Sequence, residues 1–213
     1  MANAVSKRDE RKRLHQELSS NQILDSAEEI FASKGFHEAT IKEIAELAEF
    51  SVGALYSFFE NKDDLFVQIY LRRGEEFMEG MRSLLSHDRP PRDQLHRLAT
   101  YQIEFMREHP NFGRLYLRDS AVVVGEVESK IDHAVADRYS EAMRLQAELF
   151  ASGQEAGVFR DGDTSVLARF FSALVAAFQA SDPIVMNGTG GPGMAVDDFL
   201  TIVDGAFGTT AAR

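Results

Sequence analysis

The chain has 213 residues, 44% of them hydrophobic and 27% charged, which is close to the average for globular proteins and enough to bury a substantial core. The absence of cysteine excludes disulfide frameworks, thiolate zinc sites and cysteine nucleophiles, and it fits a reducing compartment. The sequence shows neither an N-terminal apolar leader nor an uninterrupted run of about 18 apolar residues. We therefore expect a cytoplasmic protein that has no membrane partner.

The net charge of −11 argues against nonspecific binding to polyanions, because a phosphate backbone is attracted mainly by clustered Lys and Arg. A local exception lies in residues 1–18, which hold five cations against three acids. This segment is interpreted either as a basic N-terminal arm or as a solvated disordered tail. Its five cations are Lys7, Arg8, Arg11, Lys12 and Arg13.

The first expected helix covers residues 21–34, where apolar side chains recur at i, i+4, i+7 and i+8 from Ile23. Either Ser19 or Ser20 is the expected N-cap, and Gly35 is the expected end.

A second helix is expected over residues 40–49, because its first four residues match a capping box. Ser51 is a ready N-cap for a short third helix over residues 52–58, and Asn61 opens a fourth. Three short helices with a tight turn between the second and third describe a helix-turn-helix. The second element of such a motif can enter the major groove of DNA.

Three segments of this head carry a more specific pattern than helix spacing alone. They are Thr40-Ile41-Lys42-Glu43-Ile44-Ala45, Phe50-Ser51-Val52-Gly53-Ala54-Leu55-Tyr56-Ser57-Phe58-Phe59 and Asn61-Lys62-Asp63-Asp64-Leu65. Together they closely resemble the DNA-binding head of the tetracycline-repressor (TetR) family. The resemblance implies an all-α protein in which a three-helix head is joined by a long helix to a helical ligand-binding and dimerisation body.

The matched residues of the third helix divide into two sets. Leu55 and Phe59 lie four residues apart and can anchor the helix to the head core, while their neighbours point away. By resemblance, Tyr56, Thr40 and Lys62 would contact phosphates. The alternative is that the aromatic residues are ordinary core. The expected DNA-binding residues are Thr40, Ser51, Val52, Gly53, Ala54, Tyr56, Ser57 and Lys62.

The head departs from the family pattern at two positions. Glu49 stands where the family usually has Gly, and a non-Gly residue in a left-handed conformation costs roughly 1 kcal/mol. Either the turn is strained or its geometry differs. Phe58 stands where His or Tyr is common, so a polar contact from that position is lost.

The body is expected to be helical throughout. The fourth helix runs from Lys62 into the eighties and so connects head and body. The segment 187–193 is rich in glycine but lacks the Gly-Lys-Ser/Thr ending of a phosphate-binding loop, so it is interpreted as a linker. The further expected helices cover residues 92–108, 111–123, 126–155, 164–181 and 195–207.

Aromatic and methionine residues of the middle helices are the candidates for an effector site, because adaptable apolar side chains suit a small, partly apolar ligand. The alternative is that they are ordinary core. The expected ligand-binding residues are Phe77, Met81, Tyr101, Phe105, Met106, Tyr116 and Phe150.

These observations predict a ligand-responsive transcription regulator that acts as a repressor and binds a palindromic double-stranded operator as a homodimer. The expected domains are a basic arm (1–18), the helix-turn-helix head (19–66) and an effector-binding and dimerisation body (67–213). No cofactor or metal is expected, and no catalytic motif favours an enzyme. A DNA-binding protein of the same shape that answers to a protein partner, or organises DNA without a small ligand, is the remaining alternative.

Overall fold

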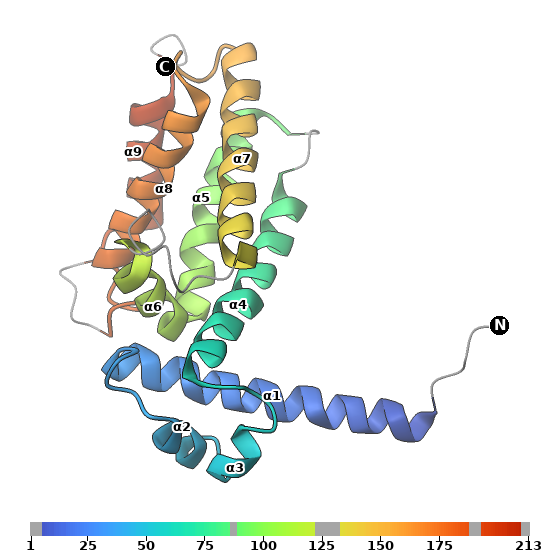
Figure 1. Ribbon diagram of the computed structural model, residues 1–213. Helices are drawn as coiled ribbons and strands as arrows, with labels where there is room; N and C mark the ends of the chain where they lie inside the picture. Colours follow the sequence, from blue (N-terminus) through green and yellow to red (C-terminus); the bar gives the residue numbers. More distant parts are fainter. Residues whose placement is uncertain (1–5, 86–88, 122–132, 188–192, 210–213) are drawn as a thin grey trace. The chain divides into compact units, whose positions relative to one another are not determined.

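The structure, a computed structural model, is built from helices (Figure 1). Apart from an isolated bridge between Phe159 and Gly208, no β-structure occurs in the part of the chain that it describes. The predicted all-α class is therefore confirmed. The described residues are 6–85, 89–121, 133–187 and 193–209.

The chain divides into two compact units, Met1–Tyr70 and Leu71–Arg213. The division falls inside one continuous helix, α4 (Lys62–Leu84), so α4 contributes residues to both units. The other helices of the first unit are α1 (Lys7–Lys34), α2 (Ile41–Leu47) and α3 (Val52–Leu55). The second unit adds α5 (Pro91–Glu108), α6 (Pro110–Ala121), α7 (His133–Glu155), α8 (Thr164–Ser181) and α9 (Val196–Phe207).

The first helix starts earlier than the apolar pattern predicts. It begins at Lys7, where the Ser6 hydroxyl accepts from the Arg8 N–H at 3.2 Å, so the expected cap at Ser19 or Ser20 was wrong. Residues 7–18 are rich in Lys, Arg, Glu, Gln and Leu, which favour helix without help from packing. All of them are exposed, so apolar periodicity carries no information about this part of α1.

The core of the first unit forms where α1, α2, α3 and the start of α4 meet. Phe31 of α1 is completely buried and packs its ring against Phe36 and Phe66, with centroids 5.6 and 5.7 Å apart. The third helix is shorter than predicted and ends at Leu55. Residues 56–58 continue as a turn because the chain tightens there to bonds between residues three apart.

In the second unit α7 and α8 pack side by side, and α5 packs against both (Figure 1). Fully buried Phe150 and Phe171 lie in the centre of the core that these helices share with α9. The predicted helix 164–181 is confirmed to the residue. Residues 126–132 of another predicted helix and 188–192 of the predicted linker lie outside the described residues.

Candidate DNA interface and effector site

The turn that joins α2 to α3 has the hydrogen bonds of a Schellman motif. The Phe50 N–H donates to the Ala45 carbonyl at 2.9 Å, and the Glu49 N–H donates to the Glu46 carbonyl at 3.2 Å. Glu49 holds the left-handed position of this motif, with φ of 59°. The glycine-type turn is therefore kept and strained, which decides between the two alternatives for this position.

Helix α3 is held at its start by a side-chain cap and at its base by the core. The Ser51 hydroxyl accepts from the Ala54 N–H at 3.1 Å. Leu55 and Phe59 are buried, as expected for the anchors of a recognition helix. The cap and the anchors fix the helix in the unit without using its outer face.

The outer face of α3 is open. Val52 and Tyr56 are 39% and 51% exposed, and an ideal Cβ on Gly53 would meet no atom within 4 Å. The Ser57 hydroxyl is exposed and donates to the Ala54 carbonyl at 2.6 Å. The structure therefore places the predicted contact residues of α3 on one accessible surface, with Phe58 packed beside it against Phe50.

Thr40 caps α2 in a complete capping box. Its hydroxyl accepts from the Glu43 N–H at 3.3 Å and donates to the Glu43 carboxylate at 2.8 Å. Glu43 also accepts from Lys34, and these hydrogen bonds lower the pKa of Glu43 to about 2. Thr40 itself is an exposed residue.

Lys62, the first residue of α4, is tied to the segment between α1 and α2. Its ammonium group donates to the carbonyls of His37 at 3.3 Å and Ala39 at 3.0 Å, and it lies 4.6 Å from the centroid of the Phe36 ring. An ammonium group has three donors, so these two carbonyls leave one donor for a further acceptor. Lys62 therefore organises the loop as well as offering charge.

The candidate effector residues divide into a ring cluster and a core group. The Phe77 ring of α4 lies 5.6 Å from Tyr101 and 5.3 Å from Phe105 of α5, and the rings of Phe112 and Tyr116 on α6 continue the series. We call these five residues the aromatic cluster. Met106 follows Phe105 on α5 and is 5% exposed.

Two further candidates belong to the main core rather than to the aromatic cluster. Met81 and Phe150 are completely buried there, and the Phe150 ring packs against Phe159, Phe171 and Phe207 at centroid distances of 5.0 to 6.2 Å. Packing against many core side chains accounts for their burial without a ligand.

Tyr101 joins α5 to α4 through a close approach of the two helices. Its hydroxyl donates to the Phe77 carbonyl at 3.0 Å. Its ring fills the space beside Gly80, where an ideal Cβ would come within 2.2 Å of the Tyr101 oxygen. Burial, with the nearby charges of Glu108 and Glu76, raises the pKa of Tyr101 to about 12.

Buried glutamines are the residues that the sequence reasoning missed. Gln102, Gln146 and Gln179 are 7%, 2% and 3% exposed, and each sits in the buried face of its helix, on α5, α7 and α8. The signal was present in the sequence as a polar residue inside an apolar stripe. On α5, for example, Gln102 follows Leu95 and Leu98 at helical spacing.

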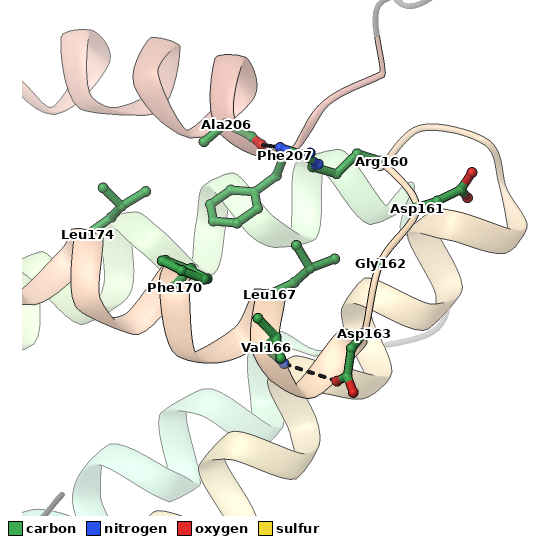
Figure 2. A pocket seen from close by; sticks show the side chains of 10 residues that line it. All are labelled: Arg160, Asp161, Gly162, Asp163, Val166, Leu167, Phe170, Leu174, Ala206 and Phe207. Atoms are coloured by element: carbon green, nitrogen blue, oxygen red, sulfur yellow. Dashed lines mark hydrogen bonds between the residues drawn. The ribbon is translucent and has the colours of Figure 1, made fainter.

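A groove of about 480 Å³ opens between α8, the end of α9 and the residues before α8 (Figure 2). Phe170, which is 64% exposed, lines the groove, and the other apolar residues of its wall are Val166, Leu167, Leu174, Ala206 and Phe207. Asp163 forms one end of the groove and also caps α8, because its carboxylate accepts from the Val166 N–H at 3.1 Å.

The described residues give no strong sign of a metal site or of a membrane span. No group of His, Asp or Glu there is placed to hold a metal ion. By length and composition α8 is apolar enough to cross a membrane, but the core helices of many proteins pass the same test, so this is weak evidence for insertion.

Two family models match the chain. Residues 23–69 match the model of bacterial regulatory proteins of the tetR family, and residues 88–179 match the tetracyclin repressor-like C-terminal domain. The chain therefore belongs to the TetR family, and it is a helix-turn-helix transcriptional regulator rather than an enzyme.

One curated relative is similar in sequence, and two solved structures share the fold. The fatty acid metabolism regulator protein of Bacillus subtilis (strain 168) is 23% identical over 151 residues, which is 70% of this chain and 74% of the relative. The ketosteroid regulator KstR2 of Mycobacterium tuberculosis has a TM-score of 0.73 and 20% identity, covering 89% of this chain and 95% of that one. The structure of AibR in complex with isovaleryl coenzyme A and operator DNA has a TM-score of 0.72 and 18% identity. The match covers 88% of this chain and 97% of that one.

Proposed function

We propose that the protein is a repressor that binds a palindromic operator as a homodimer and loses affinity for it when a small, partly apolar effector binds the second unit. The observation that carries the proposal is the outer face of α3. Its side chains are accessible, while Leu55 and Phe59 fix the helix from below. A helix presented in this way is the reading element of a helix-turn-helix.

The contacts to DNA divide into base reading and phosphate binding. Val52, Gly53, Ala54 and Ser57 meet base edges, since glycine and small side chains allow close approach to the groove. Tyr56 donates its exposed hydroxyl to a phosphate, and Ser51 lies at the same end of the helix. A second phosphate is bound by Thr40 and by the remaining donor of Lys62.

The effector is an acyl-CoA that places its acyl chain among the aromatic cluster and Met106. The similarity to a fatty acid metabolism regulator and to a structure that contains isovaleryl coenzyme A supports this class. Phe77 of the cluster lies on α4, which contributes to both units without interruption. A displacement of α4 by the effector would change the spacing of the two heads of a dimer, which is how differential binding acts on DNA affinity.

The homodimer forms through α8 and α9. On α8 the residues Val166, Phe170, Ala173 and Ala177 follow helical spacing, and none of them is buried within the chain. On α9 Ile202 is 43% exposed. An apolar stripe on two neighbouring helices suits a four-helix interface between two copies.

The test is operator binding with and without effector. Genomic fragments bound by the protein supply the operator, and its affinity is measured by fluorescence anisotropy against acyl-CoA of several chain lengths. We expect Tyr56→Phe to weaken operator binding by about 10-fold, the worth of one hydrogen bond to a charged group. Tyr139→Phe, on α7, is the matched control and should leave operator affinity unchanged.

Two outcomes would contradict the proposal. If Tyr56→Phe binds the operator as tightly as the wild type does, the proposed contact between Tyr56 and a phosphate is contradicted. If saturating acyl-CoA leaves operator affinity unchanged, acyl-CoA is not the effector. That result would favour control by a protein partner instead.

A further inference from the structure

One amide group in the buried face of α5 has a donor without a partner. Gln102 is 7% exposed, and its side-chain nitrogen is buried without a hydrogen-bond partner. Its backbone carbonyl accepts from the Gln179 amide of α8 at 2.9 Å, so the α5 backbone at this point is fixed by the neighbouring helix. The unpaired group is therefore the side-chain donor of Gln102.

The other buried glutamines of the described chain use their side-chain nitrogens. Gln94 donates to the Arg89 carbonyl at 2.7 Å, and Gln146 donates to the Ala142 carbonyl at 3.2 Å while accepting from the Ser172 hydroxyl at 3.0 Å. Gln179 donates to Gln102. A buried donor without a partner destabilises the folded chain, so Gln102 is not explained by packing as the other three are.

The surroundings of Gln102 are those expected of an apolar ligand site. Phe105 and Met106 follow it by three and four residues on α5, so their side chains lie on the same face of the helix. Phe105 belongs to the aromatic cluster, and Met106 has the flexible side chain that can repack around a ligand. The nearby cation of α5, Arg107, is already neutralised by Asp182 and Glu104.

We propose that Gln102 donates its side-chain N–H to an uncharged carbonyl oxygen of the effector. This rests on the effector class proposed above, and in an acyl-CoA the acceptor is the thioester carbonyl. A neutral acceptor fits better than a carboxylate, because an amide supplies no charge to balance an anion that has lost its water. Gln102 thereby selects the activated acyl group over the free acid and over carbonyl-free analogues.

The test compares octanoyl-CoA with S-octyl-CoA, a thioether in which a methylene replaces the carbonyl. Titration calorimetry on the full-length protein should show that the wild type prefers octanoyl-CoA by about 10-fold. Gln102→Leu, which has a similar volume, should bind both within about twofold, since the lost hydrogen bond is the source of the preference. Gln94→Leu is the matched control and should keep the preference.

A second readout separates this role from a structural one. Without ligand, the Tm of Gln102→Leu should equal or exceed that of the wild type, because an unpaired donor has been removed, whereas Gln94→Leu should lower Tm. A fall in Tm for Gln102→Leu would overturn the inference.

The two proposals fail differently. A wild type that binds both probes equally, or a Gln102→Leu variant that keeps the preference, overturns the role of Gln102 and leaves the acyl-CoA effector standing. A wild type that binds neither probe overturns the effector class and the inference that rests on it.

Discussion

Glu49 shows how a single residue can carry strain that the fold does not need. Its φ of 59° is natural for glycine, while a side chain in this region costs about 1 kcal/mol. We expect Glu49→Gly to raise the free energy of unfolding by about 0.5 to 1 kcal/mol, reduced by the greater freedom of glycine in the unfolded chain. Urea unfolding measures the change.

The control for this prediction lies three residues earlier. Glu46 is exposed within α2, so Glu46→Gly should lower the free energy of unfolding by about 1 kcal/mol. If both glycines destabilised the protein, the left-handed position of Glu49 would not be strained.

Residues with a local role were predictable, and residues with a tertiary role were not. The capping box at Thr40 and the cap at Ser51 follow from neighbours within four positions, so the sequence alone locates them. Lys62 was predicted as a phosphate contact, but its two carbonyl partners come from a loop more than twenty residues earlier. The unpaired amide of Gln102 likewise depends on which side chains surround it.

Among the helices, ends that carry a local signal were predicted, and ends without one were missed. The end of α8 was predicted because Asp182 and Pro183 follow it, and the structure shows that Asp163 caps its start. The start of α1 was missed because its first twelve residues bury nothing, so only their helix propensity reports the helix. Apolar periodicity detects a helix only where the helix packs.

Helices α4 and α5 approach so closely at Gly80 that one added methyl group should disturb their packing. Gly80→Ala would place a Cβ 2.2 Å from the Tyr101 oxygen, so the ring must move, and we expect a loss of about 1 to 3 kcal/mol in unfolding free energy. Tyr101→Phe keeps the ring and should lose about 1 kcal/mol with the hydrogen bond to Phe77.

Gly74→Ala is the matched control on α4. Its nearest neighbour would be the flexible Arg138 side chain, at 3.1 Å, so the gain in helix propensity should make this variant neutral or stabilising in urea unfolding. A Gly80→Ala variant as stable as Gly74→Ala would show that Tyr101 does not hold α4 closely.

The exposed start of α1 is the other element with a predicted function. Residues 19–66 hold three Lys against ten acids, and each Lys already has a partner: Lys34 with Glu43, Lys42 with Glu46 and Lys62 with two carbonyls. Residues 7–18, with five cations against three acids, are the net positive segment of this unit, so we infer that long-range attraction for DNA comes from them. We propose that these residues lie along the DNA backbone as a helical extension.

Replacing Arg8, Arg11 and Lys12 with Gln tests this extension while keeping good helix formers. Each lost phosphate contact should flatten the slope of log operator affinity against log salt by about 0.9, with little change in base preference. The control replaces Arg89, Arg97 and Arg144, which are exposed in the second unit and lie outside α8 and α9, and it alters the net charge equally. Equal slopes for the two variants would assign the effect to overall charge and leave the extension without a DNA role.

The apolar stripe on α8 predicts the oligomeric state of the protein. Phe170 is 64% exposed, and in a dimer through α8 and α9 it would become buried. Phe170→Glu would place a carboxylate without a partner in that interface, so we expect the variant to sediment as a monomer at micromolar concentration where the wild type is a dimer. Operator affinity should fall with it, because one head then binds alone.

Leu47→Glu, which removes a 43% exposed apolar side chain from α2, is the control that should remain a dimer. If the wild type sediments as a monomer at the same concentration, the proposed dimer is contradicted, and the proposed palindromic operator with it.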